Sequence, residues 1–275
     1  MGKISSEAKK DYFEKLKNYK VEVERLQKRE VNLAKIVETG QAGTEQKLLA
    51  LADENLNLVS YFLLMNGLSV SLLGVKNEAF LNDARKGCYK AIINLEKIVS
   101  NYVDVPFSEY EEMLEKIDSM DDASRYRLMR KLGYSIDSVV DGFGDNSKWK
   151  WSFVEIQARY ATVCKNMINL KTYISGMDPR VPGYMERQAH MKLAMELLQA
   201  AADGYRQKYE LSTLRLDDFK IAINYLAAIR RIHSLLGNSE ESESMKKKID
   251  IWRTKMETDL KKKELRSKAE KGPGK

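Results

Sequence analysis

The chain is poor in the residues that cross-link or interrupt a fold. Its 275 residues include only two cysteines and four prolines. Domains held by disulfides are usually small and rich in cysteine, so we expect Cys88 and Cys164 to be buried thiols. Each proline falls where the apolar periodicity also stops, and proline does not continue a helix. A chain of this length can bury a large core without cross-links. These absences predict long helices separated by short breaks.

Groups that carry catalysis or bind metals are also scarce. The only histidines are His190 and His233, and no Cys-His or Ser-His spacing places a nucleophile beside a base. Glu186 lies one turn before His190, but this spacing matches neither the Glu-x-x-His of di-iron bundles nor the two-histidine zinc pattern. We therefore interpret His190 as a packing or surface residue. We predict no catalytic residue, no metal ligand and no cofactor, hence a protein that is not an enzyme.

Charge is missing from one long segment. Asp, Glu, Lys and Arg make up 32% of the chain, yet none occurs in residues 55–75. A helix that is apolar on nearly every side is hidden in a core, a partner or a membrane. This one is long enough to cross a bilayer, and Gly67-x-x-x-Ser71 has the small-residue spacing of packed membrane helices. Its several Asn and Ser residues favour the buried central helix of a bundle instead, with a membrane span as the minority interpretation.

Apolar periodicity divides the chain into helices. We expect helices at 5–38, 44–73, 77–102, 108–118, 123–140, 147–175, 184–210 and 217–236, and a last one from 239. Thr44 and Asn77 are expected to cap two of them, and Ser108 with Glu111 to form a capping box. The first helix carries a coiled-coil-like heptad seam broken once, at Glu30. No segment alternates with period two, so we predict an all-α fold, an elongated irregular bundle of about eight or nine helices with no sheet.

The most turn-rich stretch of the chain is Gly-Phe-Gly-Asp-Asn at 142–146. We interpret it as the boundary between two domains. Residues 1–141 would form an N-terminal helical bundle that contains the long heptad-like helix. Residues 147–270 would form a C-terminal bundle that ends in a basic helix, and 271–275 a disordered tail.

The net charge of +7 comes from the C-terminus. Residues 244–275 hold 12 Lys and Arg against 5 Asp and Glu, whereas residues 1–243 are neutral overall. The opposite bias occurs at 104–122, where eight carboxylates, including Glu109, Glu111, Glu112 and Glu115, accompany one lysine. Patches of opposite sign can pair within one molecule or between neighbours.

Tryptophan marks two segments as candidate contact sites. In Lys148-Trp149-Lys150-Trp151 the rings are two positions apart, so on a helix they point in nearly opposite directions. We expect one to anchor the core and the other to contact a partner. In the last helix, Met245, Ile249, Trp252 and Met256 recur at steps of four, three and four and give a narrow apolar stripe on a charged rod. This stripe favours docking on another helix.

The Lys-rich heptad opening, the Gly-Phe-Gly-Asp-Asn-Ser-Lys-Trp-Lys-Trp-Ser-Phe segment at 142–153 and the helical remainder resemble accessory proteins of spirochaete periplasmic flagella, of the coiling or sheath type. The resemblance rests on pattern over most of the chain. It implies a non-enzymatic bacterial motility protein that coats or braces a filament. It also implies the periplasm, for a mature form. The N-terminus shows no secretory signal, which makes the cytoplasm the default location.

Together these features predict a structural scaffold protein whose partners are other proteins or copies of itself. The alternative is a nucleic-acid or anionic-surface binder that acts through the basic C-terminal helix. Added salt would weaken binding of that kind. The residues expected to contact partners are Trp149, Trp151, Ile249, Trp252, Met256, Glu109, Glu111, Glu112, Glu115, Lys246, Lys247 and Lys248.

Overall fold

The structure is a computed structural model that describes residues 5–40, 43–144 and 148–270, with side chains described as far as residue 265. This part of the chain contains ten α-helices and no strand. The predicted all-α class is therefore confirmed. The predicted tail at 271–275 and residues 145–147 of the turn-rich stretch lie outside the described residues.

The helices follow the predicted order with short connections. They are α1 (Ser6–Glu38), α2 (Thr44–Leu73), α3 (Glu78–Val99), α4 (Glu111–Glu115), α5 (Asp122–Phe143), α6 (Lys150–Asn166), α7 (Leu170–Ser175), α8 (Tyr184–Lys208), α9 (Leu216–Leu235) and α10 (Ser239–Glu270). A 3₁₀ turn at Phe107–Glu109 precedes α4, and a π-helical turn at Tyr209–Thr213 joins α8 to α9.

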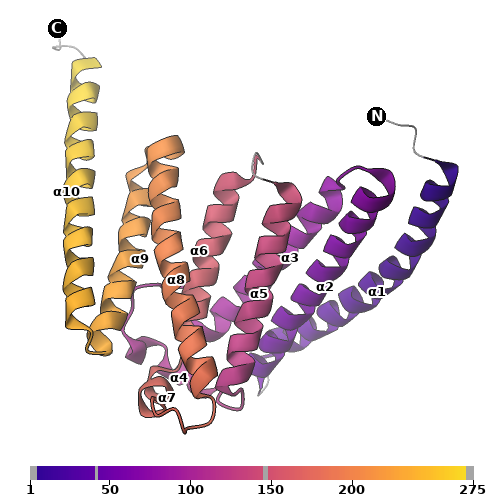
Figure 1. Ribbon diagram of the computed structural model, residues 1–275, viewed down its shortest axis with the longest axis horizontal. Coiled ribbons are helices and arrows are strands. Elements are labelled where there is room, and N and C mark those ends of the chain that lie inside the picture. Colours follow the sequence, from indigo (N-terminus) through magenta and orange to yellow (C-terminus); the bar gives the residue numbers. More distant parts are fainter. Residues whose placement is uncertain (1–4, 41–42, 145–147, 271–275) are drawn as a thin grey trace.

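Most long helices pack against helices that are close to them in the chain. α2 packs between α1 and α3, α3 contacts α5 and α6, and α6 packs most extensively on α8. α9 then lies between α8 and α10. The chain consequently runs across the molecule from α1 at one edge to α10 at the other (Figure 1), and the start of α1 lies far from the end of α10.

The two edge helices are highly charged, and each covers the interior with one apolar stripe. In α1, Tyr12, Leu16, Val23 and Leu26 are buried against α2. Glu30, the residue that breaks this seam, accepts hydrogen bonds from Asn55 Nδ2 of α2 and Lys90 Nζ of α3 at 2.9 and 2.8 Å. The residue that breaks the seam, Glu30, thus links α1 to both α2 and α3. Helices with one apolar and one polar face can end a stacked array without leaving its core open.

One cluster of buried apolar residues extends from Leu48 in α2 to Trp252 in α10. Helices on both sides of the 142–146 stretch therefore share a core, and the division into two domains stays a prediction. Cys88 and Cys164 are buried free thiols within this cluster, as expected. Burial raises the pKa of Cys88 to about 12 and also raises the pKa of Cys164, which keeps both thiols protonated.

Local signals placed some helix ends correctly and others wrongly. The Asn77 side chain accepts hydrogen bonds from the amides of Ala79 and Phe80 and caps α3 as predicted. The cap of α2 is Gly43, at φ 78°, and Thr44 is already helical, so the predicted threonine cap is wrong. The left-handed conformation at that position suits glycine because it has no Cβ.

Two further helix predictions are wrong. The capping box at Ser108 and Glu111 does not form, because 107–109 is a 3₁₀ turn and α4 begins only at Glu111, without a side-chain cap. The single helix predicted at 147–175 is broken after Asn166. The Asn169 side chain accepts hydrogen bonds from the amides of Lys171 and Thr172 and starts α7 as a new helix.

Candidate protein-binding face

The second half of α2 is covered on only part of its circumference. α1 packs along it through contacts that include Leu58 and Met65, and α3 packs beside it. A strip that includes Leu64 remains open, however, with Leu64 49% exposed, and Val70, on a different side of the helix, is 44% exposed. The expectation that 55–75 is hidden on all sides is therefore wrong for its second half. Among the described residues, α2 is also the helix long and apolar enough to cross a membrane, and 33% of its most apolar stretch is buried.

The open strip of α2 faces α5 across a groove of about 580 Å³. Ser60, Leu64, Gly67 and Ser71 recur at steps of four, three and four, so they share one side of α2. The wall from α5 consists of Tyr134, Ser135, Ser138 and Gly142, and the remaining lining residues are Tyr19, Leu63, Asn66 and Leu68. None of the lining residues is charged.

One end of this groove is fixed by polar contacts between its walls. Lys131 Nζ of α5 lies 2.6 Å from Asp53 Oδ1 and donates to Asn57 Oδ1 at 2.8 Å, both on α2. Beyond the other end, Lys76 Nζ donates to the carbonyl of Phe143 at 3.5 Å. Polar contacts therefore join α5 to α2 at one end of the groove and to the connection after α2 beyond the other, and the apolar stretch lies between them.

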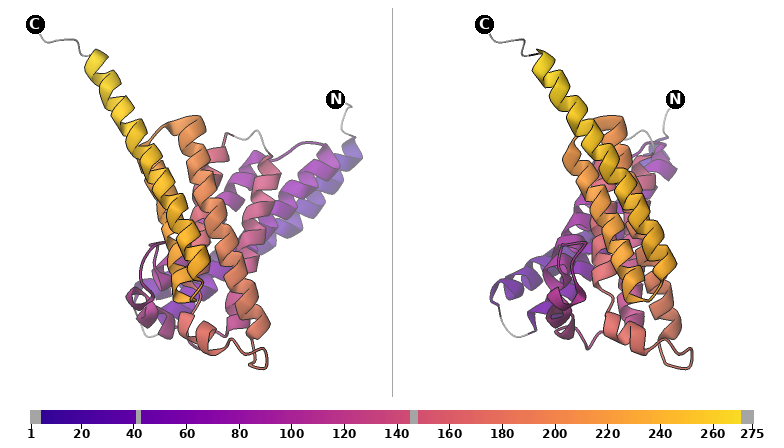
Figure 2. Two further views of the ribbon diagram at one scale, coloured as in Figure 1. Left: turned by 60° about the vertical axis from the view of Figure 1, so that its left-hand side comes forward. Right: turned by 90° about the vertical axis from the view of Figure 1, so that its left-hand side faces the viewer.

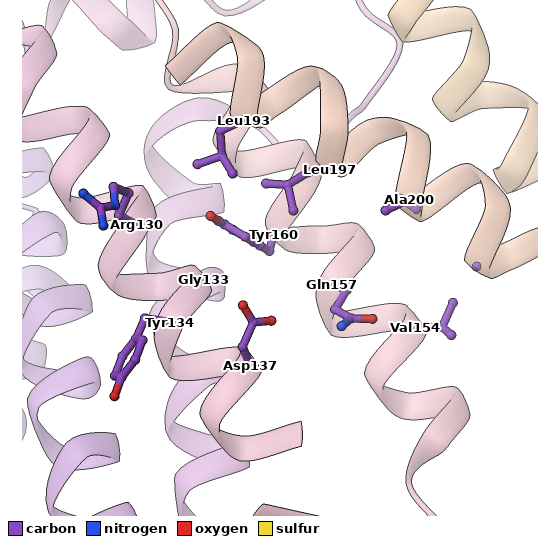
Figure 3. A pocket seen from close by; sticks show the side chains of 12 residues that line it. Arg130, Gly133, Tyr134, Asp137, Val154, Gln157, Tyr160, Leu193, Leu197 and Ala200 are labelled. Atoms are coloured by element: carbon purple, nitrogen blue, oxygen red, sulfur yellow. The ribbon is translucent and has the colours of Figure 1, made fainter. Parts of the chain in front are cut away.

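A second groove, of about 360 Å³, lies on the other side of α5. α5 and α8 provide its walls, and Val154, Gln157 and Tyr160 of α6 lie between them (Figure 3). The Tyr160 hydroxyl donates to the carbonyl of Met129 at 2.9 Å. A Cβ at Gly133 would lie 2.6 Å from that hydroxyl, so glycine is what allows the ring to lie against α5. Small residues therefore shape this groove as well.

Tyr134 lies between the two grooves and lines both. Its side chain is 76% exposed, the highest value among the large apolar and aromatic side chains of the described chain. In Figure 3 it leaves α5 in a different direction from Asp137, which lines only the second groove. Partial burial of Asp137, together with repulsion from Asp141 one turn later, raises the pKa of the Asp137 carboxyl. The face formed by α2, α5 and α8, which we call the grooved face, combines open apolar surface with little charge.

The two tryptophans near the start of α6 are both half-buried. Trp149 packs against the core cluster, with the Arg85 guanidinium 3.9 Å from its ring centroid and Phe143 in an edge-to-face contact. The Trp151 ring lies 5.2 Å from Lys150 Nζ. Trp149 therefore contacts the core, and the two rings do not differ in being half-buried. A contact of either ring with a partner stays a prediction.

The apolar stripe of α10 does not form a free docking surface. Ile249 and Trp252 are 3% and 4% exposed, and Met256 packs partly buried against the same cluster. Phe219 of α9 stacks on Trp252 with ring centroids 5.7 Å apart. The stripe docks on another helix as predicted, but that helix is α9 of the same chain, so Ile249 and Trp252 are not open to another protein.

The predicted charged contact residues are mostly exposed and lie apart. Glu109, Glu112 and Glu115 are exposed, whereas Glu111 is half-buried and forms an ion pair with Lys171. In α10, Lys246 and Lys247 are exposed, and Lys248 lies 3.9 Å from Asp203. Within the described part of the chain, no ion pair joins the acidic segment to α10.

His190 packs in the core, which confirms one of the two interpretations above. Its Nε2 lies 3.0 Å from the carbonyl of Cys164, the geometry of an N–H donor to that oxygen. Burial lowers the pKa of His190 to about 4, so the ring is neutral near pH 7. No group of three or more His, Cys, Asp or Glu that could hold a metal occurs among the described residues.

The grooved face was missed by sequence reasoning. Leu64, Gly67 and Tyr134 were not candidate contact residues, although Gly67 and Ser71 of the Gly67-x-x-x-Ser71 spacing lie on the side of α2 that lines the groove. The residues of α5 carried no comparable signal, because their place opposite α2 depends on contacts between distant parts of the chain.

Comparison with known proteins identifies a family and no function. Neither the curated proteins nor the solved structures include a match to the chain. The TP0443 family, named for a protein of Treponema pallidum, matches residues 8–260. Since this match spans nearly the whole chain and all the helices of the grooved face, the chain belongs to the TP0443 family.

Proposed function

We propose that this protein is a non-enzymatic scaffold that binds a helical segment of another protein on its grooved face. The observation that carries the proposal is the open, uncharged strip of α2 facing α5 across the 580 Å³ groove. Elsewhere along α2, helices α1 and α3 of the same chain pack against it. An amphipathic helix laid into a groove is a common mode of protein recognition.

The chemistry of the groove walls specifies this partner. Gly67, Ser60 and Ser71 have short side chains, so a helix can approach the α2 backbone closely. Leu64 and Tyr134 offer apolar contact area, and aromatic residues are enriched where proteins bind each other. The partner helix should therefore present small and apolar residues toward the groove and polar residues toward water. The serines that line the groove favour a helix over a lipid bilayer as its cover.

The resemblance to flagellar accessory proteins adds a more specific role to the proposal. In that role the bound segment belongs to a filament or to another accessory subunit, and the grooved face supplies the lateral contact.

Binding of a model helix tests the proposal directly. A labelled amphipathic peptide with an Ala and Leu face should bind the full-length protein, and a scrambled peptide of equal composition should not. Gly67→Glu should weaken binding at least about tenfold, because it puts a charge and bulk into an apolar groove. Nothing lies within 4 Å of a Cβ at Gly67, so the variant should still fold.

The matched control is Ile251→Glu. Ile251 is 67% exposed on α10, away from the grooved face, and this variant should bind the peptide like the wild type. Equal binding of the two peptides, or an unchanged affinity of Gly67→Glu, would overturn the proposal. A photoreactive residue at position 64 that labels lipid rather than protein in cells would point to a membrane instead.

A further inference from the structure

Two surfaces of opposite charge lie at opposite ends of the molecule. One, the acidic end, is formed by the exposed carboxylates of Glu109, Glu112, Glu115 and Asp118 around α4. The first turn of α10, with Glu240 and Glu241, lies at the same end (Figure 1). The α8–α9 connection and the second half of α10 lie at the other end, and α10 continues beyond its neighbours there (Figure 2).

The second surface, the basic end, contains a groove of about 600 Å³ between the turn at 209–215 and α10. Its cations are Arg215, Lys255, Lys262 and Lys263, and its carboxylates are Glu210 and Asp259. Lys255 pairs with Asp259 at 2.9 Å, and Arg206 pairs with Glu210 at 3.1 Å. Arg215, Lys262 and Lys263 have no ion pair within the described chain. The groove thus keeps a surplus of positive charge.

Apolar side chains border this charge. Leu211 and Leu214, next to the π-helical turn, are 71% and 65% exposed. Leu214 has φ 48°, in the left-handed region that costs a leucine energy and that glycine or asparagine adopts more easily. Leu214 is thus strained, largely exposed and next to cations that form no ion pair within the described chain. Apolar contact area with a charged rim is the usual composition of a protein interface.

We propose that the basic end of one molecule binds the acidic end of a second copy, head to tail. The same molecule cannot make this contact, because its two surfaces face opposite ends and no ion pair joins them. The acidic end matches the basic groove in both signs, since its carboxylates meet the surplus cations while its exposed Lys116, which lies 3.5 Å from Glu45 in one copy, can turn to Glu210 or Asp259 of the other. A phosphate surface would bring negative charge alone to those two carboxylates. This contact is independent of the grooved face.

A contact of this kind joins two different surfaces, so each added copy leaves one free acidic end and one free basic end. The product is an open chain of copies, or a ring where the rotation between successive copies closes. Because the contact is largely electrostatic and exposed, it should weaken as salt shortens the range of the interaction.

Charge reversal in two complementary variants tests the proposal. Lys262→Glu with Lys263→Glu gives a molecule with two acidic ends, and Glu112→Lys with Glu115→Lys gives a molecule with two basic ends. In sedimentation at about 50 mM salt, the wild type should grow larger with concentration and return to a monomer at about 500 mM. Each variant alone should associate at least about tenfold more weakly, and an equimolar mixture of the two should recover the association.

Lys17→Glu with Lys20→Glu is the matched control. It reverses two exposed charges of α1, at the edge of the molecule opposite α10 and outside both surfaces, and should leave the association unchanged. A wild type that stays monomeric at low salt, or a mixture that does not recover the association, would overturn the proposal. So would a monomeric wild type whose basic end binds phosphatidylserine vesicles or single-stranded RNA and loses this binding in the Lys262 and Lys263 variant.

Discussion

α2 and α10 have similar lengths, 30 and 32 residues, and are covered in different ways. α2 has no charge in its second half, yet one strip of it faces an open groove, and polar contacts join α5 to α2 at one end of that groove and to the connection after α2 beyond the other. α10 is rich in charge, yet its two largest buried side chains, Ile249 and Trp252, are almost fully enclosed by α9 and α8. In this fold, the neighbouring helices decide which side chains of a helix are buried. The composition of the helix sets only how much apolar surface it has to bury.

Loss of Trp252 should give the largest effect on stability. Trp252→Ala removes a ring that is 4% exposed and stacked on Phe219, so it should lower the free energy of unfolding by about 3–5 kcal/mol. Urea denaturation followed by circular dichroism measures the change. Ile251→Ala, at the neighbouring and exposed position, should stay within about 0.5 kcal/mol of the wild type. Similar losses in both variants would mean that α10 is not packed as the structure shows.

Acid should destabilise the core that α2 and α10 share. The pKa of His190 is about 4 in the folded protein and near the ordinary value of 6.5 when unfolded. The unfolded chain therefore binds more protons than the folded one in this interval, and stability should fall as the pH drops from 6.5 to 4. A shift of this size corresponds to about 3 kcal/mol. Urea denaturation at several pH values between 4 and 7 measures the loss.

His190→Gln is the control for this titration. Glutamine keeps an N–H donor for the Cys164 carbonyl and does not titrate, so the variant should lose less stability over the same interval. Neither α2 nor α10 contains a histidine. Because one cluster connects them, Trp252 fluorescence and a probe placed on α2 should report the same acid transition. Two separate transitions would favour the predicted division into two domains over one cooperative unit.

The sequence allowed the helices to be predicted far better than their contacts. Periodicity and the cap at Asn77 located elements because these signals act within a few residues. The same periodicity picked out Ile249 and Trp252 as an apolar stripe but not α9 as the helix that covers it. Charge counts found the acidic and basic segments, while their place at opposite ends depends on the path of the whole chain. The groove between α2 and α5 was missed for the same reason.

Two glycines provide the smallest and most local test. Gly87 of α3 faces the side of α2 that is covered, and Gly67 lies on the side of α2 that is open. A Cβ at Gly87 of α3 would lie 2.6 Å from Cγ2 of Val59, whose branched side chain has little freedom to move. Gly87→Ala should therefore force α2 and α3 apart and cost about 1–3 kcal/mol. Gly67→Ala meets nothing within 4 Å and should stabilise the protein by about 0.5–1 kcal/mol, since alanine favours helix.

Urea denaturation measures the free energy of unfolding of both variants. If this free energy changes in the same direction in both, the closed and open sides assigned to α2 are wrong. Gly67→Ala also separates stability from binding. Its methyl group narrows the groove, so the variant should unfold less easily and yet bind the model helix less tightly than the wild type. Glycine at this position lowers helix stability without relieving any clash within the chain. Tighter binding by the more stable variant would show that the groove does not need the space that Gly67 leaves.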